Sequence, residues 1–384
     1  MRVTEQKVER LHLIADELLD PVQFLLELRI GTEIPSHAWT LLDSTPMLTT
    51  MDLEQVTEAL RRFARQTIAD DARVTAVERA PGHAGFAYLF DITAANTFQQ
   101  FYLRLPPPGV KWEGTADLTR QTTALQALHG TAVPHPAVLW SGDETGVFGV
   151  PYYIVPRVDG VTLSSPETIA RFDRATLREA ARQAMTALVD VHHVDWQARC
   201  GYLGTFGGLE REITRWDRFA ERAAERDELL ALAPEVRQRL LETMPATFDI
   251  GLFHGDFQFQ NLMYGHTGDL LAVIDWELCG IGPTLGDVGW ICAFHDKPAW
   301  GPVPRPSTTF ADAPELKQWY FDALGRDESH VDWFEALSLY KYAVITGFNL
   351  MLHRRGKRVD GAWEHRRVGA PFNLRHALNL LGST

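Results

Sequence analysis

Four polar side chains, set at fixed intervals between short apolar runs, carry the chemistry that this sequence suggests. His254, Asp256 and Asn261 follow the pattern H-x-D-x-x-x-x-N within the segment GLFHGDFQFQN. A later apolar run ends at Asp275, in the segment LAVIDWE. Two carboxylates and an amide are the side chains from which an acid–base group and a binding site for a hard metal ion can be built.

The residues between Asn261 and Asp275 predict how these groups come together. Two apolar runs, 262–264 and 270–274, are separated by the turn-prone sequence Gly-His-Thr-Gly. This pattern predicts a β-hairpin. Because a hairpin brings its two ends together, we expect Asn261 and Asp275 to lie close to Asp256.

Phosphoryl transfer is the chemistry that needs this set. The protein must offset the charge of a triphosphate with Mg²⁺ held by oxygen ligands, and it must orient the attacking hydroxyl. Asp256 is predicted to accept the hydroxyl proton. Asn261 and Asp275 are predicted to bind the metal ion. Glu277 is predicted to help by contacting one of these ligands or by holding a metal-bound water. The alternative is that the two aspartates are solvated turn residues and that Asn261 caps a helix, but the ordered set favours a site.

The same motifs resemble those of the aminoglycoside phosphotransferase family, a small-molecule branch of the protein-kinase-like fold. HGDFQFQN matches the HGD-x-x-x-x-N loop of that family, and IDWE stands where protein kinases carry DFG. The longer string DWELCGIGPTLGDVGW is similar to a subgroup related to the kinase-like domains of acyl-CoA dehydrogenase fusion proteins. The resemblance runs from about Asp52 to the C-terminus. It implies that ATP and Mg²⁺ are cofactors and that Asp287 braces the catalytic loop.

The resemblance also implies two contacts to the nucleotide. APGHAGF occupies the place of the phosphate-covering loop, in which Gly82, His83 and Gly85 would let backbone N–H groups approach phosphate. YYIVPRV resembles the hinge, where the backbone of Val155 and Arg157 would bind adenine. The proline between them keeps its carbonyl but has no N–H to donate. A plain turn and a plain buried strand are the alternatives.

A cation is expected at the end of the third strand. Arg104 stands where protein kinases place their phosphate-binding lysine, and the helix residue aligned with the usual partner glutamate is Gln121. Gln121 can bond Arg104 but cannot neutralise it. Asp117, one helical turn earlier, is the alternative partner, and a solvated arginine is the alternative interpretation.

Charge and composition restrict the partners. With 37 Lys and Arg against 50 Asp and Glu, the net charge of −13 argues against a nucleic acid or an anionic membrane surface. The N-terminus lacks an apolar signal core, and no apolar run is long enough to span a bilayer. The three cysteines form no CxxC pair. We therefore expect a cytoplasmic protein whose partner is a small molecule with a hydroxyl group.

The periodicity predicts a small antiparallel β N-lobe and a larger helical C-lobe. The resemblance implies that this α+β, bilobal fold is protein-kinase-like. We expect a helical extension over 1–50, a nucleotide-binding N-lobe over 51–157 and a helical C-lobe over 158–384. Strands are predicted at 74–77, 86–92, 98–104 and 151–155. Helices are predicted at 51–67, 116–128, 176–193, 209–224, 315–324 and 331–352.

The acceptor alcohol remains open. An aminoglycoside-like substrate suits the acidic chain, whereas a hydroxyacyl-CoA would prefer a basic segment such as 353–358, which otherwise reads as a solvated helix end. A catalytically inactive nucleotide-binding pseudokinase is a further alternative. A protein kinase is disfavoured because no A-P-E segment follows Asp275. His192 and His193 are adjacent on a helix and suit packing better than metal binding.

Overall fold

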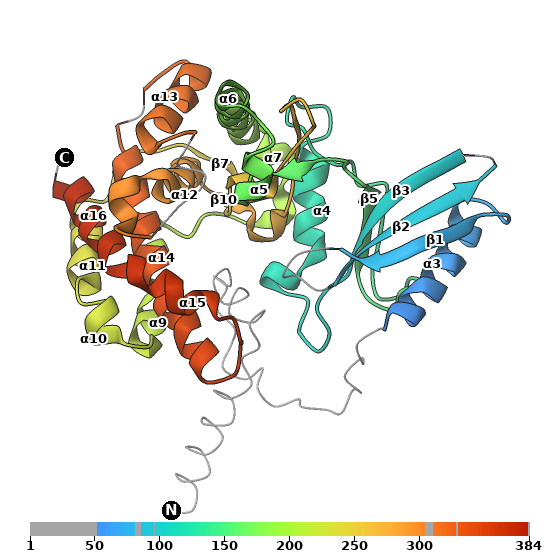
Figure 1. The fold of residues 1–384 in the computed structure, drawn as a ribbon, viewed down its shortest axis with the longest axis horizontal. Coiled ribbons are helices and arrows are strands. Elements are labelled where there is room, and N and C mark those ends of the chain that lie inside the picture. Colours follow the sequence, from blue (N-terminus) through green and yellow to red (C-terminus); the bar gives the residue numbers. More distant parts are fainter. Residues whose placement is uncertain (1–51, 81–85, 96, 304–309, 328, 383–384) are drawn as a thin grey trace, which may run out of the picture. The chain divides into compact units, whose positions relative to one another are not determined.

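The computed structural model describes residues 52–80, 86–95, 97–303, 310–327 and 329–382. The predicted extension over 1–50 and the residues Gly82, His83 and Gly85 lie outside this part of the chain. The described chain forms two compact units (Figure 1), one of residues up to 118 with 141–153, the other of residues 119–140 and 154 onward. The three-part division suggested by the sequence stays a prediction.

The first unit is built on an antiparallel sheet with a helix packed against its first strand. The sheet order is β1-β2-β3-β5-β4, and the division between the units passes through β4 and β5. The elements are α3 (Leu53–Thr67), β1 (Arg73–Arg79), β2 (Ala87–Ala94), β3 (Thr97–Arg104), the 3₁₀ helix η2 (Gly114–Ala116), β4 (Trp140–Gly142) and β5 (Tyr152–Pro156).

Local sequence explains where these elements begin. Asp52 caps α3 by accepting the Gln55 N–H at 2.8 Å, while Gln55 Oε1 accepts the Asp52 N–H at 3.0 Å. This reciprocal pair satisfies two donors at the helix start. In the sheet, Phe90 of β2 lies opposite Phe101 of β3, and their stacked rings are 5.5 Å apart. Such aromatic cross-strand pairs stabilise the register.

The second unit is mainly helical. Its elements are α4 (Leu118–Ala127), β6 (Val161–Thr162), α5 (Pro166–Ile169), α6 (Arg174–His192), α7 (Trp196–Arg199), η3 (Gly201–Leu203), α8 (Leu209–Thr214), α9 (Asp217–Arg222), α10 (Arg226–Leu229), α11 (Ala233–Glu242), β7 (Ile250–Phe253), η4 (Phe259–Asn261), β8 (Leu262–Tyr264), β9 (Leu270–Val273), η5 (Trp276–Leu278), β10 (Gly280–Pro283), α12 (Leu285–His295), η6 (Lys297–Trp300), α13 (Ala313–Leu324), α14 (Val331–Arg354), α15 (Ala362–Arg366), η8 (Arg367–Gly369) and α16 (Ala370–Gly382).

The core of this unit is formed where α14 packs between α12 and α16 (Figure 1). Nearly every residue of α12 is buried, as is most of α14. The two helices approach closely at Gly289, where an added Cβ would lie 2.4 Å from the Phe334 carbonyl carbon and 2.6 Å from the Glu335 nitrogen. Only a residue without a side chain allows this spacing.

Two small antiparallel ribbons support the segment that carries the polar motif. The predicted hairpin is confirmed, because β8 pairs with β9 and Leu262 lies opposite Val273. A second ribbon, in which β7 pairs with β10, was not predicted; Gly280 lies opposite Phe253. The strand before the motif, β7, and the strand after it, β8, are therefore each held by a paired strand.

Most predicted strands and helices are confirmed within two or three residues. The single helix predicted over 209–224 is wrong, since α8 and α9 are separate helices. At Trp216 the backbone N–H bonds the Ile213 carbonyl, three residues back, at 3.3 Å instead of continuing the four-residue ladder. This tighter turn ends α8, and the Trp216 side chain is buried.

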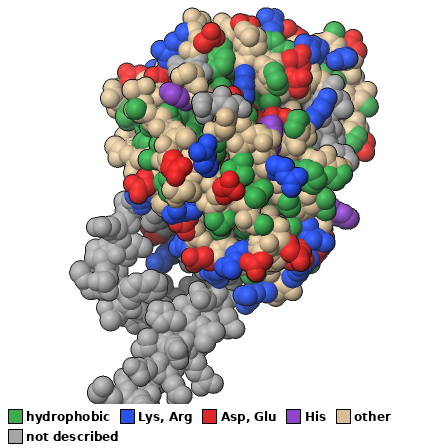
Figure 2. Space-filling model, turned by 90° about the vertical axis from the view of Figure 1, so that its left-hand side faces the viewer, with side chains coloured by type: hydrophobic (Ala, Val, Ile, Leu, Met, Phe, Trp, Pro, Cys, Tyr) green, Lys and Arg blue, Asp and Glu red, His purple; other side chains and the backbone are tan. Residues whose placement is uncertain are grey.

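Charge is dispersed over the face shown in Figure 2, where basic and acidic side chains are interspersed. The acidic excess therefore does not gather into one patch on this face. Among the described residues, no helix is both long and apolar enough to span a bilayer.

The close approach at Gly289 predicts a position-specific loss of stability. Gly289→Ala should lower the free energy of unfolding by about 1–3 kcal/mol, because α12 and α14 must separate. Gly286→Ala is the matched control on the same helix, since nothing lies within 4 Å of its added Cβ. Urea unfolding followed by circular dichroism measures both variants. Equal stability of the two would show that the helix spacing is not tight.

Candidate active site

The polar motif begins on a short loop after β7 that is held by one buried carboxylate. Asp287 of α12 accepts the backbone N–H of His254 at 2.6 Å and that of Gly255 at 2.8 Å. Burial by itself would raise the pKa of Asp287. The contacts with His192 and His254 lower it by more, so the pKa lies below its usual value. Asp287 is thus an ionised brace for the loop. The bracing role that the resemblance implied agrees with this geometry.

A second layer of polar contacts stands behind Asp287. His192 places Nε2 at 3.4 Å from Asp287 Oδ2 and Nδ1 at 2.8 Å from the Tyr320 hydroxyl. His192 is therefore part of a buried network, as the packing interpretation suggested, and its link to the polar loop was not foreseen. Its signal in the sequence was only a histidine on the buried face of a helix.

Gly255 is required by the path of the loop. Its φ of +87° lies in the left-handed region, and an added Cβ would stand 2.2 Å from the Leu278 carbonyl oxygen. Any other residue would be strained and would also clash with backbone. The loop therefore turns tightly between the brace and Asp256.

His254 links the loop to the strand that leads into Asp275. Its Nδ1 accepts the Asp256 N–H at 3.2 Å, and its Nε2 lies 2.8 Å from the Ile274 carbonyl oxygen. Because a backbone N–H can only donate, Nδ1 carries no proton and Nε2 donates to Ile274. His254 is thus a structural link between the loop and the strand that leads into Asp275.

Asp256 is held by three side-chain donors. Its Oδ1 accepts from Gln258 Nε2 and from Trp290 Nε1, the latter at 2.8 Å. Its Oδ2 accepts from Asn261 Nδ2 at 2.9 Å. Burial raises the pKa of Asp256, the Trp290, His254 and Gln258 contacts oppose this rise only in part, and the negative charge of Asp275 adds to it. The arrangement fixes a carboxylate whose affinity for a proton is higher than usual.

The three predicted oxygen groups do converge. Ile274 N–H donates to the Asn261 carbonyl at 2.9 Å, which joins the two ends of the hairpin. Asp275 follows directly with an exposed side chain and a left-handed backbone, φ +64°. Asn261 can ligate a cation only through Oδ1, because its Nδ2 donates to Asp256. Glu277 is half-buried in η5. These oxygen donors suit Mg²⁺.

Two residues that touch Asp256 were missed by the sequence reasoning. Gln258 lies inside the recognised motif, but the pattern leaves its position unspecified. Trp290 stands three residues after Asp287 on α12, so the two side chains lie on the same face of the helix. The helix thus braces the backbone of the loop with one side chain and the carboxylate of Asp256 with the other.

The predicted nucleotide-binding residues are divided between the two units. Arg104 ends β3 and is buried, and Gln121 is buried in α4. Because these two residues belong to different units, their pairing stays a prediction. Val155 is buried in β5, and Arg157, which follows that strand, is exposed. Their roles toward a nucleotide also stay predictions.

Comparison with known proteins bears on these motifs. The family described as "Phosphotransferase enzyme family" matches residues 76–324. The chain is similar to acyl-CoA dehydrogenase family member 10 of Mus musculus, with 29% identity over 217 residues that cover 54% of this chain and 19% of that protein. The chain thus matches only about a fifth of this relative.

Solved structures share the fold. A protein of Ralstonia eutropha assigned to the aminoglycoside phosphotransferases has a TM-score of 0.67 and 23% identity, covering 84% of this chain and 98% of that one. An aminoglycoside phosphotransferase in complex with AMP-PNP and hygromycin B has a TM-score of 0.53 and 15% identity, covering 85% and 98%. The predicted α+β, bilobal protein-kinase-like fold is confirmed.

The brace formed by Asp287 can be tested by stability. Asp287→Asn keeps one acceptor oxygen but turns an amide group toward a backbone N–H, so about 1.5–3 kcal/mol of unfolding free energy should be lost. Asp227→Asn is the control, since that side chain is 90% exposed. Chemical denaturation at neutral pH measures both. A loss no larger than that of the control would remove Asp287 as the support of the loop.

Proposed function

Since the chain belongs to the phosphotransferase enzyme family, we propose that it is a kinase that transfers the γ-phosphoryl group of ATP to a hydroxyl of a small molecule. The observation that carries the proposal is Asp256, which is fixed by three donors and is joined through Asn261 to the hairpin that leads into Asp275. A turn aspartate in solvent would need none of these supports.

In this proposal Asp256 orients the acceptor alcohol. The hydroxyl proton passes to the Asp256 carboxylate as the oxygen–phosphorus bond forms and the bond from the γ-phosphorus to the ADP oxygen breaks. We expect Oδ2 to receive the proton, because Oδ1 already accepts from Gln258 and Trp290 while Oδ2 accepts from Asn261. The donors therefore select the oxygen as well as the direction of the carboxylate.

Asn261 Oδ1 and Asp275 would hold Mg²⁺, with Glu277 nearby in sequence and half-buried. The ion, when bound, would offset the negative charge of the triphosphate. The related aminoglycoside phosphotransferase solved with AMP-PNP supports a nucleotide as the second ligand. Arg104 and Gln121, the phosphate-covering loop and the hinge residues Val155 and Arg157 remain the proposed nucleotide contacts.

A second candidate for the acceptor is a hydroxyacyl-CoA. It is favoured by the similarity to an acyl-CoA dehydrogenase family member. The basic segment 353–358 gives it less support, because Arg354 already forms ion pairs with Glu225 at 2.6 Å and Glu364 at 2.7 Å. A panel of aminoglycosides, amino alcohols, sugars and hydroxyacyl-CoAs, assayed for ADP release, discriminates between the acceptor classes.

Magnesium dependence tests Asp275. Asp275→Ala should remove the gain in ATP affinity that Mg²⁺ gives the wild type, because an exposed carboxylate ligand is lost. Calorimetric titration of ATP with and without Mg²⁺, on both proteins, measures this, and the Mg²⁺-free titrations are the internal control. Equal affinities in all four titrations would exclude Asp275 from the metal site.

The transfer step tests Asp256. Asp256→Asn should retain the fold and ATP binding while the single-turnover rate falls at least about a hundredfold, since an amide cannot accept the proton. The exposed Asp269→Asn in the hairpin turn is the matched control and should keep the wild-type rate. A folded, ATP-saturated Asp256→Asn protein that transfers phosphate at the wild-type rate would refute the mechanism.

A further inference from the structure

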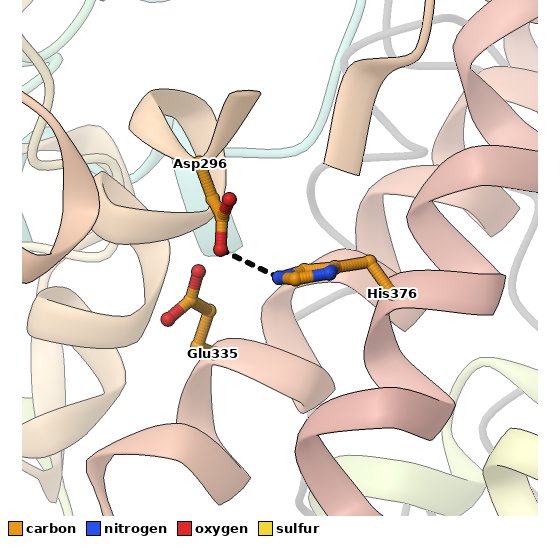
Figure 3. A group of neighbouring side chains, drawn as sticks. All are labelled: Asp296, Glu335 and His376. Carbon is orange, nitrogen blue, oxygen red and sulfur yellow. Dashed lines mark hydrogen bonds and ion pairs between the residues drawn. The ribbon is translucent and has the colours of Figure 1, made fainter. Parts of the chain in front are cut away.

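A separate group of side chains with potential metal-ligand atoms lies at the far end of α12, where α14 and α16 meet it. Asp296 follows the last residue of α12, Glu335 lies in the first turns of α14, and His376 lies in α16. One potential ligand atom from each residue lies within 4.8 Å of the others. Figure 3 shows the Glu335 carboxylate and the His376 ring both directed toward Asp296.

Glu335 is the least expected member of this group. Its side chain is fully buried, and its Oε1 accepts no hydrogen bond from the described part of the chain. Lys317 of α13 lies 2.6 Å from Oε2 and also 2.6 Å from Asp332 Oδ1. A buried carboxylate oxygen without a donor is costly. Oε1 is therefore open to a partner that the described part of the chain does not supply.

The charges of the group leave room for a dication. Asp296, Glu335 and Asp332 carry three negative charges, and Lys317 supplies one positive charge. Two negative charges remain once His376 has lost the proton that it shares with Asp296, and a divalent cation would offset them.

We propose that Asp296, Glu335 and His376 bind a divalent transition-metal ion of the Zn²⁺ type, distinct from the Mg²⁺ of the triphosphate. One imidazole nitrogen with two carboxylate oxygens suits Zn²⁺, whereas Mg²⁺ takes oxygen ligands. Three protein ligands leave the fourth tetrahedral position to water.

Binding requires one small rearrangement. His376 Nε2 is 2.5 Å from Asp296 Oδ2, whereas two ligands with bonds of about 2.1 Å to one tetrahedral ion lie roughly 3.4 Å apart. The ring therefore moves about 1 Å away from Asp296. The ion replaces the proton that now joins Nε2 to Oδ2, and that proton is released to solvent.

The bound ion would be structural. It would tie the end of α12 to α14 and α16, and α12 carries both Asp287 and Trp290. The proposal does not depend on phosphoryl transfer, because metal binding and stability are measured without nucleotide or acceptor.

The test uses chelator-treated full-length protein and Zn²⁺ in the presence of excess Mg²⁺. Dialysis with elemental analysis should find one tightly bound Zn²⁺ per wild-type chain, and Zn²⁺ at a hundredfold excess over its dissociation constant should raise Tm by about 3 °C or more. His376→Gln should weaken Zn²⁺ binding at least about tenfold, which at the same Zn²⁺ concentration reduces the rise in Tm to about half or less. The exposed His365→Gln is the matched control and should behave as the wild type.

Asp275→Ala separates this site from the proposed triphosphate site, and it should bind Zn²⁺ as the wild type does. Co²⁺ titration of the wild type needs no variant and should give the visible absorption of a tetrahedral ion, which Zn²⁺ removes. Absence of Zn²⁺ and Co²⁺ binding by the wild type would overturn the proposal. Wild-type affinity in folded His376→Gln, or loss of binding in Asp275→Ala, would overturn it equally.

Discussion

Two hydrogen bonds from the backbone of one turn to the Asp287 carboxylate support the rest of the polar site. The N–H groups of His254 and Gly255 both donate to this carboxylate, and buried donors need acceptors. These two bonds fix the position of the backbone directly before Asp256. Every later contact, from His254 to Ile274 and from Asn261 to Asp256, presupposes that starting point.

The same helix turns this brace into a defined side-chain direction. A helix brings residues three apart onto one face, so Asp287 and Trp290 contact the same loop. The close packing of α12 on α14 at Gly289 lies between these two residues. The distance between α12 and α14 therefore affects the position of Trp290, and through it the direction of the Asp256 carboxylate.

Sequence reasoning reached the parts of the site that depend on local pattern. The hairpin between Asn261 and Asp275 followed from apolar runs around a turn, and local hydrogen bonds do bring Asn261 to Asp256. Gln258, Trp290 and the pairing of β7 with β10 depend on contacts whose geometry no pattern of polar and apolar residues specifies. The break at Trp216 was missed for a related reason, because a continuous helical periodicity does not specify where a backbone N–H bonds the carbonyl three residues back instead of four.

Most groups around Asp256 come from one continuous stretch, residues 250–290, with His192 and Tyr320 joining it from elsewhere in the chain. Such a layout has an evolutionary consequence. This stretch can keep its internal contacts while substitutions accumulate in other helices at positions that do not pack against it. Under the proposed function, a change of acceptor then needs no change in how residues 250–290 are assembled.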